Sequence, residues 1–210
     1  DASGNNNVLT VDDTTNFKVE NGKLYFIGSS PNFEGQSSYS VTVTSTDANN
    51  GNALVKSQLF TINVTDVNEA PTAIALSANV ITENVIVDTG VEVGTLTVTD
   101  PDASGNNNVL TVDDTTNFKI ENGKLIFIGS SPDFETKSSY SVTVTSTDGS
   151  LVKSETFTVN VSNVNEAPTA IALSANVIAE NVIVGTGVEV GTLTVTDPDA
   201  SGNNNVLTVD

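Results

Sequence analysis

The residues of this chain that could do chemistry are its carboxylates, which gather at a few positions instead of spreading evenly. Calcium takes about six to eight oxygen ligands, and acidic side chains at alternate positions can converge on one ion. Closely spaced acids occur at Asp100–Asp102 (DPD), Asp133–Glu135 (DFE) and Asp66–Glu69 (DVNE). Because clustered like charges repel each other without a cation, this spacing predicts a site for a hard, oxygen-liganded cation. Ca²⁺ is the first candidate.

The same residue types also populate turns, where Asp and Asn side chains bond to nearby backbone groups. Any single Asp in this sequence fits a turn as well as a cation site. The set recurs in register at the predicted ends of strands, and this recurrence favours cation ligands.

The composition excludes most other chemistry. The 210 residues include 26 acidic and 7 basic side chains, for a net charge of −19, and no His, Cys or Trp. Without His or Cys, zinc, copper, haem and iron–sulfur sites and the usual nucleophile–base pairs are excluded. The negative charge argues against binding to nucleic acid or an anionic membrane surface. No apolar run approaches the roughly 20 residues of a membrane-spanning helix, so we expect no membrane insertion.

The elements that position the carboxylates belong to a long internal repeat. The sequence DASGNNNVLTVD occurs at Asp1–Asp12, Asp102–Asp113 and Asp199–Asp210. A period of this length fits one sandwich domain per repeat, and it is too long for a solenoid. The copies differ in length at Thr46–Ser57, against Thr147–Ser154, which predicts a surface turn there.

Alternating apolar and polar residues predict about seven strands and no helix in the complete repeat. Asn122-Gly123 is a strong hairpin signal between two of them. The pattern predicts an all-β fold of tandem, seven-stranded Greek-key β-sandwiches of the cadherin or immunoglobulin type. The expected strands are Thr72–Ala78, Val91–Asp100, Val109–Asp113, Phe118–Ile120, Lys124–Ile128, Tyr140–Thr147 and Glu155–Val164.

Prolines 71 and 168 follow acidic linkers and predict the domain edges. Residues 71–167 are expected to form a complete repeat. Residues 1–70 form a repeat that lacks its first strands, and residues 168–210 form the N-terminal part of a third. Either the sequence is a segment of a longer continuous array, or the tail of one chain completes the head of the next. The second alternative makes a filament by strand complementation.

Five motifs in order give the complete repeat a recognisable pattern: ITEN (Ile81–Asn84), LTVTDPD (Leu96–Asp102), DFE (Asp133–Glu135), VTSTD (Val144–Asp148) and the linker DVNEAP (Asp66–Pro71). With them the repeat resembles a cadherin domain along its whole length, in the form found in large bacterial surface adhesins. The resemblance implies an extracellular or cell-surface location. It also implies a Ca²⁺ cluster at each junction between neighbouring repeats, which stiffens the array.

The resemblance also implies the ligands of two junctions. The first would take Asn32, Glu34, Asp66, Asn68, Glu69, Asp100, Asp102 and Asp148. The second would take Glu83, Asp133, Glu135, Asn163, Asn165, Glu166, Asp197 and Asp199. The linker is one residue shorter than the animal pattern, and neutral Asn32 and Asn163 replace aspartates, so we expect one or two ions per junction.

Three classes of function remain open. A calcium-rigidified structural or adhesive spacer is favoured, with neighbouring repeats or neighbouring chains as partners and a glycan or surface target reached through other regions. A carbohydrate-binding module normally uses exposed aromatic residues, and this chain has three Tyr and no Trp. A hydrolase could use a carboxylate pair such as Asp133 and Glu135, but tandem identical active sites argue against an enzyme.

Overall fold

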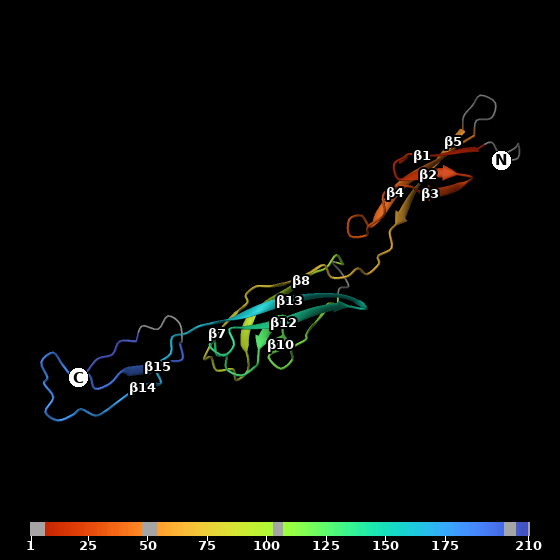
Figure 1. The fold of residues 1–210 in the computed structure, drawn as a ribbon. Coiled ribbons are helices and arrows are strands. Elements are labelled where there is room, and N and C mark those ends of the chain that lie inside the picture. Colours follow the sequence, from red (N-terminus) through yellow and green to blue (C-terminus); the bar gives the residue numbers. More distant parts are fainter. Residues whose placement is uncertain (1–6, 48–53, 103–106, 200–204, 210) are drawn as a thin grey trace. The chain divides into compact units, whose positions relative to one another are not determined.

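The computed structural model describes residues 7–47, 54–102, 107–199 and 205–209, and all regular elements among them are β-strands (Figure 1). The chain divides into two compact units. The first consists of Asp1–Ala70 with Asp100–Asn106, and the second of Pro71–Thr99 with Asn107–Asp210. None of the described elements is a helix long and apolar enough to cross a membrane.

The second unit contains a sandwich of two four-stranded sheets, in the orders β10-β11-β8-β6 and β7-β13-β12-β9. The predicted all-β sandwich is confirmed, with one strand more than expected. The short strand β7 joins the second sheet by parallel pairing with β13, whereas β6 joins the first sheet. The strands are β6 (Ala73–Leu76), β7 (Val80–Thr82), β8 (Val91–Thr99), β9 (Val109–Val112), β10 (Phe118–Glu121), β11 (Lys124–Phe127), β12 (Ser139–Asp148) and β13 (Leu151–Ser162).

The core of this sandwich lies between the two sheets, where alternate side chains of facing strands meet. Leu125 of β11, Val144 of β12 and Val159 of β13 are fully buried together with residues of β6, β7 and β8. Phe127 packs edge-to-face against Phe118 and Tyr140, with ring centroids 5.5 and 4.9 Å apart. Period-2 alternation of apolar residues therefore places one face of every strand in a common core.

Tight hairpins connect the long strands. Asn122 and Gly123 join β10 to β11 with φ angles of 51° and 73°, as the type I′ turn requires. Gly149, with φ 58°, lies in the turn that joins β12 to β13, at the surface position predicted from the length difference between repeats. Its longer counterpart in the first repeat, residues 48–53, lies outside the described residues.

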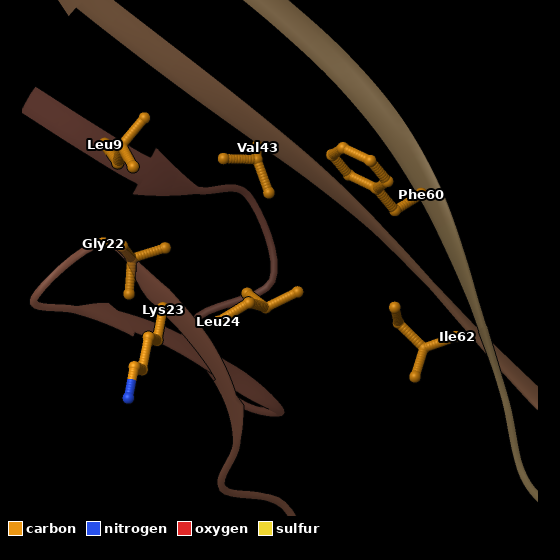
Figure 2. Close-up of a pocket in the computed structure, with 8 residues that line it drawn as sticks. Leu9, Gly22, Lys23, Leu24, Val43, Phe60 and Ile62 are labelled. Carbon is orange, nitrogen blue, oxygen red and sulfur yellow. The ribbon is translucent and has the colours of Figure 1, made fainter. Parts of the chain in front are cut away.

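The first unit repeats only part of this sandwich. It has two sheets, β1-β4-β5 and β2-β3, and its described residues contain no counterpart of β6, β7 or β8. Phe17 and Val41 are its buried hydrophobic side chains, and Phe17, Phe26 and Tyr39 repeat the aromatic cluster. An apolar pocket of about 290 Å³ lies in this unit, and its lining includes Leu9, Val43 and Phe60 (Figure 2). The strands are β1 (Asn7–Val11), β2 (Phe17–Glu20), β3 (Lys23–Phe26), β4 (Ser38–Asp47) and β5 (Leu54–Asn63).

Residues 168–199 of the second unit form a two-stranded antiparallel sheet of β14 (Ala170–Leu173) and β15 (Leu193–Thr196). Its pairing reproduces the register of β6 with β8, because Ala170 lies opposite Thr196 as Ala73 lies opposite Thr99. Most of its apolar side chains are exposed.

Candidate metal centres

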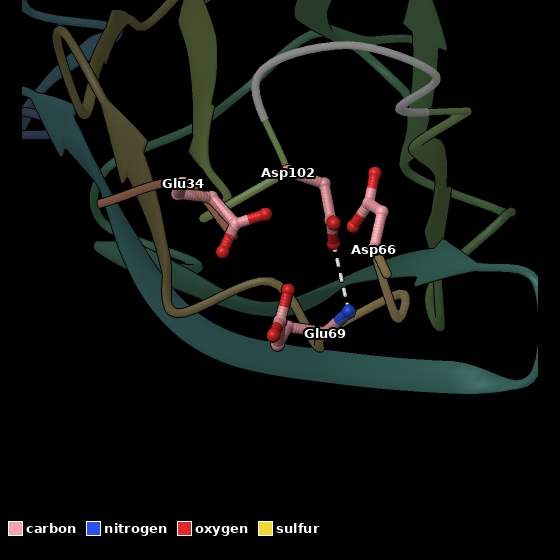
Figure 3. Close-up of side chains that lie close together, drawn as sticks. All are labelled: Glu34, Asp66, Glu69 and Asp102. Atoms are coloured by element: carbon pink, nitrogen blue, oxygen red, sulfur yellow. Dashed lines mark hydrogen bonds between the residues drawn. The ribbon is translucent and has the colours of Figure 1, made fainter. Parts of the chain in front are cut away.

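The first carboxylate cluster consists of Glu34, Asp66, Glu69 and Asp102, all in the first unit (Figure 3). One carboxylate oxygen from each residue lies within 4.8 Å of one from every other. Glu34 comes from the turn before β4, Asp66 and Glu69 from the extended segment after β5, and Asp102 from the DPD motif. The structure thus brings together four predicted ligands that are far apart in sequence.

Backbone hydrogen bonds hold Asp102 in this cluster. Its side chain is buried, and its Oδ2 accepts a hydrogen bond from the Glu69 amide at 2.7 Å. The Asp102 amide in turn donates to Asp100 Oδ1 at 3.1 Å, which closes the DPD turn. The DPD and DVNE motifs therefore fix each other's orientation.

The second carboxylate cluster consists of Glu83, Asp133, Glu135, Glu166 and Asp199, all in the second unit. Glu83, Asp133 and Glu135 form one close group, and Glu135, Glu166 and Asp199 form another. Glu135 belongs to both. The Glu166 amide donates to Asp199 Oδ2 at 2.6 Å, which repeats the contact between Glu69 and Asp102. The Asp199 amide likewise donates to Asp197 Oδ1, at 3.0 Å.

Glu83 is the most buried carboxylate of the second cluster. It follows β7 directly, and its exposed fraction is 2%. Its Oε2 accepts a hydrogen bond from the Phe134 amide at 2.8 Å, and its Oε1 accepts one from the Val164 amide. One side chain therefore ties the strand after the first linker to the DFE turn and to the second linker.

Neighbouring carboxylates make both clusters unfavourable for negative charge. Burial raises the pKa of Glu69, and the charges of Glu34 and Asp102 raise this pKa further. Burial also raises the pKa of Glu135, with added repulsion from Glu83, Glu166 and Asp199. Asp133 is different, because hydrogen bonds from the backbone and hydroxyl of Thr136 lower its pKa.

Each cluster contains a buried oxygen that no donor among the described residues satisfies. Glu69 Oε2 and Glu166 Oε2 are buried without a hydrogen-bond partner among the described residues. The ion pairs of the described chain join Lys18, Lys119, Lys124 and Lys153 to glutamates outside both clusters. Buried carboxylate oxygens without a proton donor or a lysine fit the donor set that Ca²⁺ prefers.

The side chains of the four predicted Asn ligands form hydrogen bonds within or beside the motifs that carry them. Asn32 Oδ1 accepts a hydrogen bond from the Gly35 amide at 2.6 Å, within the turn that carries Glu34. Asn68 and Asn165 each donate to the carbonyl of the following glutamate, at 3.3 and 3.2 Å. Asn163 donates to Glu135 Oε1 at 2.8 Å, so it contacts the second cluster directly.

Asp148 lies at the end of β12 in the second unit, where it is buried. Its Oδ1 accepts a hydrogen bond from the Asn107 amide at 3.4 Å, and its Oδ2 has no hydrogen-bond partner among the described residues.

Sequence reasoning missed one member of the second cluster's surroundings, Asn84. Its side-chain amide donates to Glu166 Oε1, and its own amide donates to the Pro132 carbonyl at 3.0 Å. The backbone of Asn84 is left-handed, with φ 59°. An Asn after the glutamate of ITEN is a residue that tolerates this conformation, and this was the available signal.

Comparison with known proteins places this arrangement in a structural context. The chain is similar to a protocadherin gammaB7 EC3-6 cis-dimer structure, with 27% identity, 90% of this chain and 48% of that chain covered, and a TM-score of 0.68. It is also similar to the crystal structure of mouse cadherin-23 EC22-24, with 22% identity, 91% of this chain and 65% of that chain covered, and a TM-score of 0.67. A third similar structure is that of extracellular cadherin domains 1-5 of protocadherin gamma B2, with 19% identity, 91% of this chain and 39% of that chain covered, and a TM-score of 0.67.

These similarities show that the chain has a cadherin-like fold. The chain spans about half the length of the protocadherin gammaB7 structure it matches. No protein-family model matches it, and no curated protein matches it either.

Proposed function

We propose that this chain is a set of calcium-rigidified spacer repeats from a long extracellular protein, of the kind found on bacterial surfaces, without catalytic activity. The observation that carries the proposal is the pair of carboxylate clusters. Equivalent motifs build both of them. Among the described residues, each cluster holds one buried oxygen without a donor, and no lysine forms an ion pair with either cluster. The similarity to extracellular cadherin domains supports the location and the structural role.

Calcium would stiffen the chain because each cluster joins segments that belong to different repeats. In the second cluster, Glu83 and Glu135 come from the sandwich, Glu166 from the linker and Asp199 from the following segment. An ion held by these oxygens would neutralise their mutual repulsion and fix the linker against both sides. Because it binds the assembled cluster better than the separated parts, it would also stabilise the fold.

The test is a calcium titration of the whole chain by calorimetry, with small-angle scattering in calcium and in chelator. Asp199→Asn keeps an oxygen that can accept the Glu166 amide but removes the charge. We expect it to weaken calcium binding at the second cluster by about tenfold or more. Asp102→Asn should do the same at the first cluster.

The matched control is Asp88→Gly, because Asp88 is exposed outside both clusters and Gly185 occupies its place in the next repeat. It should leave calcium binding unchanged. Identical scattering curves and identical thermal stability in calcium and in chelator would contradict the proposed mechanism.

A further inference from the structure

Asn84 lies beside the second carboxylate cluster, although it is not one of the carboxylates. Its side-chain amide donates a hydrogen bond to Glu166 Oε1. Because a carboxylate oxygen only accepts hydrogen bonds, the group of Asn84 that faces Glu166 is its NH₂ and not its carbonyl oxygen. In this arrangement Asn84 acts on the cluster as a hydrogen-bond donor, and the oxygens offered to an ion come from its neighbours.

Main-chain hydrogen bonds fix the position of Asn84. The parallel register of β7 with β13 places Thr82 opposite Ser162. The Glu83 amide continues this pairing by donating to the Ser162 carbonyl at 3.2 Å, and the Asn84 amide donates to the Pro132 carbonyl at 3.0 Å. Asn84 is therefore held between the end of β13 and the turn that carries the DFE motif, whatever its own side chain does.

The backbone conformation at this position restricts the residue type. Asn84 is left-handed, with φ 59°, and Asn181, which has the same place in the next repeat, has φ 61°. Most side chains are strained in this conformation, whereas Asn tolerates it and Gly adopts it without steric cost. Gly would suit the backbone but would bring no donor, so Asn meets both requirements at once.

The contact with Asn84 determines how Glu166 presents its two carboxylate oxygens. The backbone of Glu166 is anchored separately, because its amide donates to Asp199 Oδ2 at 2.6 Å. Its Oε1 accepts the Asn84 amide, whereas its Oε2 is buried with no hydrogen-bond partner among the described residues. Glu166 also belongs to the close group with Glu135 and Asp199. With Oε1 held by Asn84, the oxygen left without a donor is Oε2.

An amide is suited to this task because it carries no charge. A lysine in the place of Asn84 would neutralise Glu166 and compete with a cation for the same oxygens. The amide holds the carboxylate in one orientation and leaves its negative charge available. Hydrogen bonds that orient metal-ligating side chains in this way typically contribute about 10–100-fold to metal affinity.

We propose that Asn84 is a positioning residue, which orients Glu166 for a divalent cation. Its amide holds Oε1 on the sandwich side of the junction, so the carboxylate of the linker is in place before an ion arrives. Glu166 then offers Oε2 without first having to order its side chain, which lowers the entropy cost of binding. The inference rests on the proposed function, since the cation is the calcium proposed there, but the hydrogen bond itself does not require calcium.

The test is a calcium titration of the whole chain with the variant Asn84→Gly, which keeps the left-handed backbone and removes the donor. Binding is followed by NMR at the Glu166 and Glu69 amides, because each donates to an aspartate of its own cluster. We expect the apparent Kd reported by Glu166 to rise about tenfold. The Kd reported by Glu69 should not change, so the first cluster is an internal control.

Two further variants separate positioning from a general structural effect. Asn181→Gly makes the same backbone change at an exposed residue and should leave both Kd values unchanged. In a chain that carries Glu166→Ala, calcium binding is followed at the Phe134 amide, which donates to Glu83. There Asn84→Gly should no longer weaken binding, because Asn84 acts through the Glu166 side chain.

Hydrogen exchange in chelator tests the contact without calcium. The Glu166 amide should exchange faster in Asn84→Gly than in the unaltered chain. Asn84→Asp should have the same effect, because Asp tolerates the left-handed backbone but its carboxylate cannot donate. Agreement of the two variants would show that the lost donor, and not the flexibility of Gly, is the cause. Circular dichroism checks that both variants remain folded.

The outcomes distinguish this inference from the proposed function. Calcium binding that is unchanged by Asn84→Gly would overturn the inference and leave the proposed function standing. Equal weakening with and without Glu166→Ala would also overturn it, and so would unchanged exchange of the Glu166 amide in chelator. An unaltered chain that binds no calcium would contradict the proposed function itself, and the inference would fail with it.

Discussion

Replacing Glu83 by Gln tests whether the second cluster is built around a hydrogen-bonded carboxylate. The two oxygens of Glu83 accept the Phe134 and Val164 amides, and the side chain is buried. A Gln side chain offers one oxygen and one NH₂ group, so one of the two amides loses its acceptor. A buried amide without a partner costs about 1–3 kcal/mol.

The loss of negative charge in Glu83→Gln stabilises the fold, but by less than the lost hydrogen bond destabilises it. Gln removes a negative charge from the neighbourhood of Asp133 and Glu135, which relieves repulsion. Both of these residues are exposed, so water screens their charges, and pairwise terms of this kind are worth less than about 1 kcal/mol. We therefore expect Glu83→Gln to destabilise the second unit by about 1–3 kcal/mol in chelator. For a domain of this size each kcal/mol lowers the Tm by about 4–8 °C.

The assay is thermal unfolding followed by circular dichroism, together with hydrogen exchange at the Phe134 and Val164 amides. The control is Glu180→Gln, since Glu180 occupies the same place in residues 168–199 and is exposed. Glu180→Gln should change the free energy of unfolding by less than about 0.5 kcal/mol.

Equal stability of the two variants would refute the reasoning, and so would a more stable Glu83→Gln chain. Either result would mean that the burial of charge outweighs the two hydrogen bonds. In calcium the deficit of Glu83→Gln should widen, because the variant also loses a ligand and with it part of the stabilisation that bound calcium supplies.

Two other predictions follow from the same structure. In chelator, the raised pKa values of Glu69 and Glu135 mean that the folded chain takes up protons before the unfolded chain does. In chelator, its thermal stability should therefore increase as the pH falls from neutral towards 4.5. In calcium, the thermal stability should decrease over the same range, because protons displace the ion. A thermal stability that decreases as the pH falls in chelator would contradict the first expectation. Leu125→Ala should cost about 2–5 kcal/mol and Leu24→Ala less than half as much, because one side chain is fully buried and its counterpart is 36% exposed. Equal losses of stability in chemical denaturation would show that burial does not decide the cost.

The sequence was sufficient to predict most strands and the sandwich class, because apolar alternation and the Asn-Gly turn are local signals. Alternation alone did not predict strand β7, since three residues give no recognisable period. The carboxylate motifs indicated which residues gather, but not that Glu135 belongs to two groups, which depends on how the DFE turn faces both linkers.

The burial of individual side chains could not be predicted from the local sequence. Leu24 and Leu125 have the same immediate neighbours in sequence on the N-terminal side, and Leu96 and Leu193 lie in identical stretches. One member of each pair is in the core and the other is exposed. The difference arises from whether a second segment is present to cover the strand, and no local pattern contains that information.

The near-identity of residues 71–102 and 168–199 also has a consequence for how the chain folds. Both segments flank the same sandwich body, one before β9 and the other after β13, and both carry the side chains that complete it. During folding, two interchangeable pieces therefore compete for a single surface. Neighbouring domains in multidomain proteins are prone to misassembly with each other, and sequences this alike remove the chemical difference that would sort them. Such a chain must rely on the order of synthesis and on connection lengths to select the right partner.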